Sequence, residues 1–78
     1  MTPAAEVVAT LTPRQKDVAL LAARGDGTTA IATALGMSYD AAKAHVNAIS
    51  DKLNLDDDRG PLERVRRWAI EHRALLLP

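Results

Sequence analysis

Residues 27–53 contain the feature that most constrains the fold, which is a pair of short amphipathic runs that meet at a tight break. The break reads Leu35-Gly36-Met37-Ser38. Glycine tolerates the left-handed backbone conformation that ends many helices, and serine is a favoured cap at the start of the next helix. Because so few residues join the two runs, the sequence predicts a helix-turn-helix unit.

The remainder of the chain is also typical of helices. It has 78 residues, no phenylalanine and no cysteine, and no segment alternates apolar and polar residues as a strand would. The sequence therefore predicts one all-α domain of four helices, at 13–24, 29–35, 39–53 and 61–76. We expect residues 1–10 to be a flexible N-terminal segment, with at most a fraying turn of helix after Pro3, and residues 11–78 to form the domain.

Local signals set the ends of these helices. Thr12 and Gln15 have the spacing of a capping box, Pro13 suits the first helical position, and Gly25 suits the C-cap. The run 39–53 then separates into an inward apolar face and an outward stripe. The inward face contains Ala42, Val46, Ile49 and Leu53, and the outward stripe contains Asp40, Lys43, Ala44, Asn47 and Asp51.

Composition excludes several functions. The ten basic and ten acidic residues cancel, so net charge does not itself indicate a nucleic-acid partner. His45 and His72 are isolated and are best interpreted as core histidines, which leaves neither a catalytic set nor a metal site; no cofactor and no enzymatic activity are expected. The absence of a signal sequence and of a long apolar run predicts a cytoplasmic protein that does not use a membrane.

The order and spacing of short motifs resemble the DNA-binding domain of the LuxR/GerE family, found alone or as the output domain of response regulators such as NarL. The resemblance covers about 11–75. It runs through the segments Leu11-Thr12-Pro13-Arg14, Leu21-Ala22-Ala23-Arg24-Gly25, Ile31-Ala32, Leu35-Gly36-Met37-Ser38, Lys43-Ala44-His45-Val46 and Lys52-Leu53, and continues into 62–72.

The resemblance implies a bacterial transcriptional regulator that binds double-stranded DNA with the helix 39–53 in the major groove. Lys43, Ala44 and Asn47 would then face the base edges, although periodicity alone would also fit a solvated helix face. Phosphate contacts are expected from residues that surround this helix. These residues are Thr28, Thr29, Arg14, Arg24 and Lys52.

Family members commonly pair through the last helix, so the resemblance also implies a homodimer. Val65, Trp68 and Leu75 are the candidate contacts between subunits. The alternative is that Trp68 only covers the small core.

A different class of function is also open. The domain could be a protein-interaction module with weak or lost DNA binding that acts through residues 61–76 on RNA polymerase or another regulator. The neutral charge, Ala30 and Ala41 at positions where the family usually has polar residues, Asp51 and the acidic run 56–58 favour this alternative.

Overall fold

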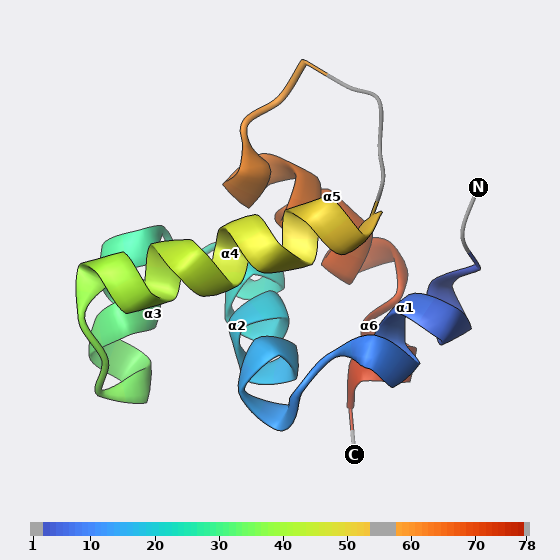
Figure 1. Ribbon diagram of the computed structural model, residues 1–78, viewed down its shortest axis with the longest axis horizontal. Helices are drawn as coiled ribbons and strands as arrows, with labels where there is room; N and C mark the ends of the chain where they lie inside the picture. The colour runs from blue at the N-terminus through green and yellow to red at the C-terminus, as the bar shows by residue number, and fades with distance from the viewer. Residues whose placement is uncertain (1–2, 54–57, 78) are drawn as a thin grey trace.

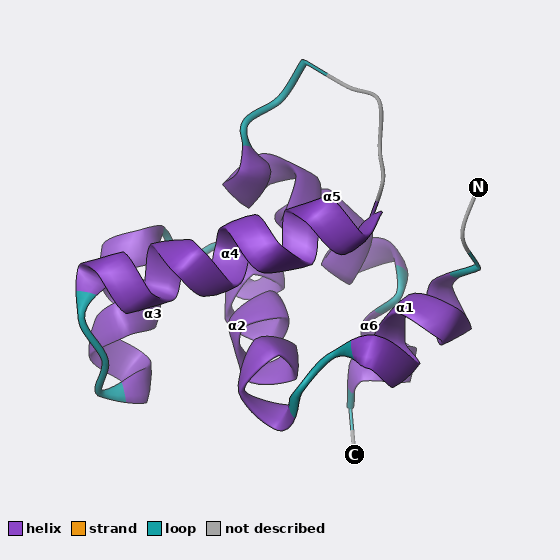
Figure 2. Ribbon diagram, viewed as in Figure 1, coloured by secondary structure: helices purple, strands orange, loops and turns teal. Residues whose placement is uncertain are grey.

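The computed structural model describes residues 3–53 and 58–77, and within them it contains six helices and no strand (Figures 1 and 2). The all-α class predicted from the sequence is confirmed. No helix in the described residues is long and apolar enough to cross a membrane. The helices are α1 (Ala4–Thr10), α2 (Pro13–Arg24), α3 (Thr28–Leu35), α4 (Tyr39–Leu53), α5 (Pro61–Glu71) and α6 (Arg73–Leu76).

The start and end of α2 follow from the residues that flank it. The Thr12 hydroxyl accepts a hydrogen bond from the Gln15 amide at 3.1 Å, and the Gln15 side chain accepts one from the Thr12 amide at 3.1 Å. This reciprocal pair is the predicted capping box, and Pro13 occupies the first helical position. Gly25 ends the helix with a φ of 107°, a conformation that residues with a side chain rarely adopt.

The predicted helix-turn-helix is formed by α3 and α4. Gly36 closes α3 in the left-handed conformation, with a φ of 66°, and Met37 then donates its amide to the Ala32 carbonyl at 3.0 Å. The Ser38 hydroxyl caps α4 by accepting from the Ala41 amide at 3.0 Å. The structure thus confirms that turn chemistry sets this break.

Each of the four longer helices contributes a fully buried side chain to one core. These side chains are Val18 of α2, Ile31 of α3, Ile49 of α4 and Val65 of α5. Burial of one such side chain stabilises the fold by about 1.5–3 kcal/mol, so this shared cluster holds short helices that would be marginal alone.

The N-terminal residues that the structure describes include a helix. Ala4–Thr10 form α1 within the segment expected to be flexible, and Val7 of this helix is buried in the core. The reason is tertiary: α1 lies against α6, whose Leu76 is also buried. This N-terminal segment has no strong helix caps, but it is helical because its apolar face packs against α6.

The C-terminal helix also differs, because the single predicted helix 61–76 is divided in two. His72 interrupts it with a φ of −121° and a ψ of 26°, and its ring lies 5.4 Å from that of Trp68. The bend turns α6 toward α2 and α1 and buries Leu76. The described residues therefore contain the four predicted helices, the last of them divided into α5 and α6, and in addition α1.

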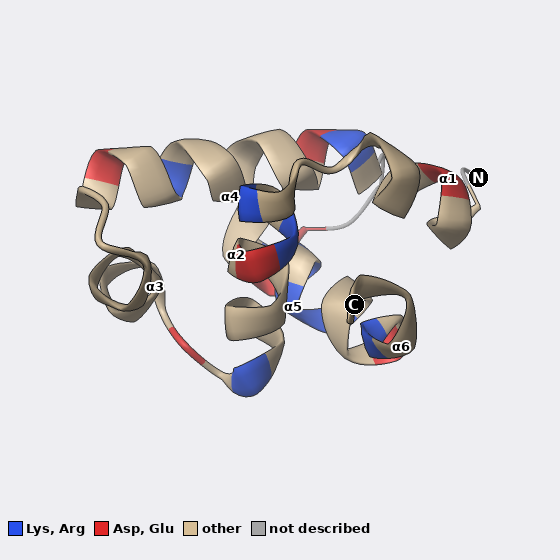
Figure 3. Cartoon of the chain, turned by 90° about the horizontal axis from the view of Figure 1, so that it is seen from below, with Lys and Arg blue, Asp and Glu red and all other residues tan. Residues whose placement is uncertain are grey.

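The arrangement leaves α4 along one face of the molecule. Figures 1 and 3 show α4 extending across this face, with α3 at the end where α4 begins. α5 packs against both α2 and α4. The predicted acidic connection before α5 includes Asp56 and Asp57, which lie outside the described residues.

Candidate nucleic-acid interface

The two faces of α4 differ sharply in exposure. The four residues predicted to face inward are all buried, together with Ser50. The five residues of the outward stripe are all exposed. An α-helix with side chains has a diameter of about 10–12 Å, and the major groove of B-DNA is about 12 Å wide. The outer face of α4 therefore has the shape and accessibility of a groove-reading surface.

Lys43, Ala44 and Asn47 lie on two successive turns of this outer face. Within residues 3–53 and 58–77, the side chains of Lys43 and Asn47 make no hydrogen bond or ion pair. Their donors and acceptors are consequently available to a ligand. A lysine ammonium can donate to the acceptors of guanine, an asparagine amide can pair with adenine, and an alanine methyl can contact the thymine methyl.

The start of α3 offers main-chain donors beside α4. Gly27 is the N-cap and supplies no side-chain cap, and the first hydrogen bond in the helix joins the Ile31 amide to the Gly27 carbonyl at 2.9 Å. The amides that precede Ile31 have no acceptor within the helix, which is the usual basis of phosphate binding at a helix N-terminus. Thr28 is half-buried and Thr29 is exposed at this end.

The predicted arginine contacts have different surroundings. Arg14 is exposed in the first turn of α2. Arg24 is exposed too, but its guanidinium bonds both carboxylate oxygens of Asp26, at 3.3 Å and 2.5 Å. This hydrogen bonding, and secondarily the charge of Asp26, raises the pKa of Arg24 above its ordinary value. Arg24 is therefore a cation whose charge is already partly balanced.

The Lys52 side chain is hydrogen-bonded to residues of the same chain. Its ammonium donates to the Thr10 carbonyl at 2.8 Å and to the Gln15 side-chain oxygen at 3.1 Å. The partners lie 42 and 37 positions away, so no local pattern in the sequence could reveal them. Of the five residues predicted to contact phosphates, Lys52 is the one whose side chain ties α4 to the region between α1 and α2.

The candidate dimer residues separate into two groups. Val65 is fully buried and Trp68 is 8% exposed, so both belong to the core of this chain, as the alternative interpretation of Trp68 predicts. Leu75 is 47% exposed. Ile70 and Leu77, which were not among the predicted contacts, are 52% and 54% exposed near the same end of the chain.

Two further features were not predicted. Arg66 of α5 bonds main-chain carbonyls at the end of α2 and in the connection to α3, and no signal in the sequence indicates contacts over such a separation.

A surface pocket of about 380 Å³ lies between α2 and α3. It is lined by Asp17, Leu20, Leu21, Arg24, Ala34 and Leu35.

Charges of both signs border the outer face of α4. Figure 3 shows acidic and basic residues toward both ends of α4; in the sequence, Asp40 precedes Lys43 by three positions and Asp51 adjoins Lys52. A carboxylate that faces a phosphate is repelled, so this surface has less electrostatic attraction for DNA than a uniformly basic one. Recognition through this face must depend on a small number of well-placed contacts.

Comparison with known proteins agrees with this geometry. Residues 9–60 match the family model described as bacterial regulatory proteins, luxR family. This range contains α2, α3 and α4, while the similarity noted for 61–75 lies beyond it. Neither the curated proteins nor the solved structures gave a match. On the match over 9–60, which is two thirds of its length, the chain belongs to the LuxR family of bacterial regulatory proteins and is a helix-turn-helix DNA-binding domain.

Proposed function

We propose that this domain acts as a transcriptional regulator, or as the output domain of one, by inserting α4 into the major groove of double-stranded DNA. The observation that carries the proposal is the division of α4 into a buried inner face and an exposed outer face with no polar partner for Lys43 or Asn47 in the described residues. Such a helix can enter the groove without loss of core contacts.

In this proposal the base edges meet three side chains. Lys43 donates to guanine acceptors, Asn47 pairs with adenine, and Ala44 contacts a thymine methyl. All three are exposed on α4, which supports their assignment. The domain carries out its role by binding alone and requires no cofactor.

Phosphate contacts would fix the position of the domain on the duplex. The first amides of α3, with Thr28 and Thr29, and the exposed Arg14 are the favoured donors. Arg24 would first have to leave Asp26, to which it is hydrogen-bonded. Lys52 is the weakest candidate because the Thr10 carbonyl and the Gln15 side chain already accept from it.

We also propose that two copies bind together on a two-fold site. The exposed Leu75 supports a contact near the C-terminus. The other two predicted contact residues, Val65 and Trp68, are buried in the core and cannot themselves touch a second copy in this conformation. Two domains related by a two-fold axis would read half-sites one helical turn apart, a separation of about 34 Å.

A second function is favoured by a specific observation. Ile70, Leu75 and Leu77 are each about half exposed, and the outer face of α4 includes the carboxylates of Asp40 and Asp51. Apolar side chains at the surface mark contact sites for other proteins. A module that uses 61–76 to contact RNA polymerase, with weak or lost DNA binding, would have both features.

A mobility-shift series at low salt with mixed genomic fragments separates the two functions. We expect retardation that weakens as salt is raised, because phosphate neutralisation releases counterions. The absence of any retardation at high protein concentration would refute DNA binding and leave the interaction module.

A further inference from the structure

The connection between α2 and α3 contains only Gly25, Asp26 and Gly27. Gly25 is in the left-handed conformation and Gly27 is extended, with a φ of −81° and a ψ of 174°. Glycine on both sides of a single residue gives this connection more conformational freedom than any other pair of neighbours would. The orientation of α3 relative to α2 therefore depends on the contacts that fix Asp26.

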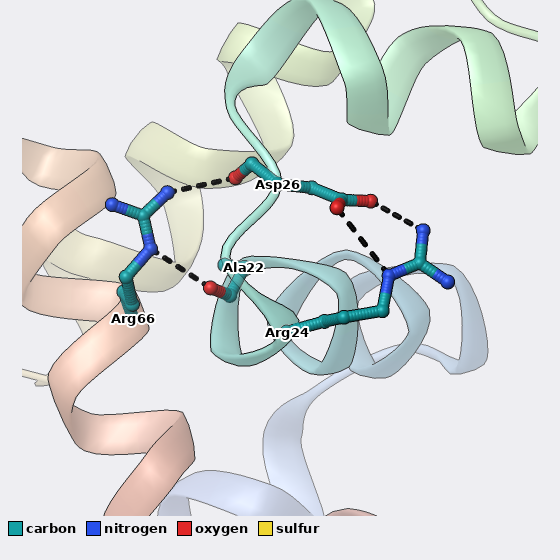
Figure 4. Close-up of polar contacts among 4 residues, drawn as sticks. All are labelled: Ala22, Arg24, Asp26 and Arg66. Atoms are coloured by element: carbon teal, nitrogen blue, oxygen red, sulfur yellow. Dashed lines mark hydrogen bonds and ion pairs between the residues drawn. The ribbon is translucent and has the colours of Figure 1, made fainter.

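Arg66 belongs to α5, which packs against α2, and its guanidinium bonds this connection (Figure 4). Its Nε donates to the Ala22 carbonyl at 2.9 Å, and its Nη2 donates to the Asp26 carbonyl at 2.8 Å. The remaining terminal nitrogen, Nη1, is paired with Glu63 on the preceding turn of α5. One planar guanidinium thus joins the last turn of α2 to the residue that precedes the cap of α3.

The chemistry of these contacts suits an arginine. The Ala22 carbonyl lies in the last turn of α2, where carbonyls carry partial negative charge and a cation is favoured; it also accepts the Gly25 amide at 3.0 Å. The Asp26 carbonyl lies in the connection that follows. The two donors belong to one rigid fork, which fixes the separation of the two carbonyls as well as bonding each. The Arg66 side chain is only 21% exposed, so water competes weakly for these bonds.

The held segment leads directly into the candidate phosphate site. The Asp26 amide donates to the Leu21 carbonyl at 3.1 Å, and the next residue, Gly27, caps α3. α3 spans eight residues, so it has little intrinsic stability to resist a change at its first turn. A shift of Asp26 would move the free amides of that turn relative to α4.

We propose that Arg66 is a positioning residue for DNA binding, which sets the first turn of α3 against α4 although it lies on neither helix. The proposal rests on the proposed function of the α3 and α4 surface. Arg66 itself need not contact DNA, because its guanidinium nitrogens are occupied by Ala22, Asp26 and Glu63.

The test compares Arg66→Gln with Arg67→Gln. Arg67 is exposed on the same helix and makes no hydrogen bond or ion pair within the described residues, so its replacement removes the same charge without the contacts. Amide hydrogen exchange, followed by NMR, reports the Asp26 and Ile31 amides, whose acceptors are the Leu21 and Gly27 carbonyls. The Val46 amide in α4 serves as the internal reference.

We expect Arg66→Gln to accelerate exchange at Asp26 and Ile31 by roughly tenfold while Val46 is unchanged, since local opening is separable from global unfolding. Arg67→Gln should leave all three amides unchanged. Equal acceleration at Val46 would mean that Arg66 stabilises the whole fold, and no acceleration would mean that it holds nothing; either result overturns the proposal.

Fluorescence anisotropy with a pool of labelled random-sequence duplexes provides the second readout. Arg66→Gln should bind about tenfold more weakly than Arg67→Gln, an affinity ratio that lost phosphate contacts can produce. Equal affinities of the two variants would overturn the positioning role. If the unmodified domain does not bind the pool, the proposed function fails, whereas the exchange experiment still decides whether Arg66 holds α3.

A variant that does not fold would not end the test. Arg66→Lys retains the charge and can bond one of the two carbonyls, but a lysine ammonium lacks the planar fork. We expect it to fold and to show the same local acceleration at Asp26 and Ile31, and wild-type protection in this variant would overturn the role of the fork.

Discussion

The side-chain ammonium of Lys52 donates a hydrogen bond to the main-chain carbonyl of Thr10 at 2.8 Å, although the two residues are 42 positions apart. The same ammonium also bonds the Gln15 side chain, which belongs to the capping box of α2. Lys52 therefore joins the end of α4 to the first turn of α2 and to the end of α1.

Lys52→Met should lower the free energy of unfolding by about 1–2 kcal/mol, since the Thr10 carbonyl loses the ammonium donor and the Gln15 oxygen keeps only the Thr12 amide. Urea unfolding followed by circular dichroism measures this. Lys16→Met is the control, because no hydrogen bond or ion pair of that side chain occurs in the described part of the chain. Reduced DNA affinity with unchanged stability would instead identify Lys52 as the phosphate contact that the family resemblance implies.

Lys43→Ala should weaken DNA binding and reduce the slope of log affinity against log salt by about 0.9, the value for one lost phosphate or groove cation. The fold should be unaffected because Lys43 is exposed. Anisotropy titrations at several salt concentrations measure both quantities. Arg67→Ala removes an equal charge from α5, and a matching loss in that variant would show that only net charge matters.

Asp26→Asn should strengthen DNA binding by a few fold, which is roughly the effect of one additional exposed cation. The substitution removes the carboxylate that raises the pKa of Arg24 and holds its guanidinium, but it keeps the main-chain carbonyl that Arg66 bonds. Arg24 remains protonated in either variant, so the gain should not depend on pH near neutrality.

The comparison for this variant is Asp58→Asn, which makes the same change of charge in the exposed segment before α5. The same anisotropy titration applies to both. An equal gain in the two variants would show that Arg24 lies too far from the duplex for its release to matter.

Gly36→Ala should destabilise the domain by about 1–2 kcal/mol, because alanine is strained at the φ of 66° that closes α3. No neighbouring atom lies within 4 Å of the added methyl, so the cost is confined to the backbone. Gly27→Ala, at the other end of α3, also meets no atom but has a φ of −81°, and it should change stability by less than about 0.5 kcal/mol. Thermal unfolding of the pair measures the difference, and equal melting temperatures would contradict it.

Leu75→Asp should weaken self-association by at least about tenfold if the two-fold contact forms near the C-terminus, since an apolar side chain at a contact is replaced by a charge. Leu75 is exposed, so the fold should tolerate the change. Sedimentation equilibrium measures the association. Tyr39→Ser changes an exposed aromatic residue at the start of α4 and should have no effect, while identical behaviour of Leu75→Asp and the unmodified chain would exclude this contact.

The features predicted from the sequence are those set by neighbours in the chain. Thr12 with Gln15, Gly25, Gly36 and Ser38 act within a few residues, and each occupies its expected place. The exposed stripe of α4 followed from helical periodicity alone. These signals sufficed for the helix-turn-helix and for the surface that it presents.

The features that the sequence did not predict depend on contacts between distant segments. Val7 is helical and buried because α1 lies against α6, and Leu76 is buried because the bend at His72 turns α6 toward α2 and α1. Arg66 and Lys52 bond carbonyls some 40 positions away, at separations for which no spacing rule exists. The sequence identifies Lys52 and Arg66 as charged residues, but it does not indicate that they hydrogen-bond main-chain carbonyls of distant segments.

The separation of the two faces of α4 has a consequence for engineering. The core contains none of the exposed residues Lys43, Ala44 and Asn47. It does contain Ala42, Val46 and Ile49, which are buried and expose almost no surface to a ligand. With the base contacts proposed for these residues, a combinatorial library that randomises the three outward positions would vary base preference on a constant scaffold, and most of its members should be recovered in folded form. In this domain, the residues proposed to select an operator are separate from the residues that hold the fold.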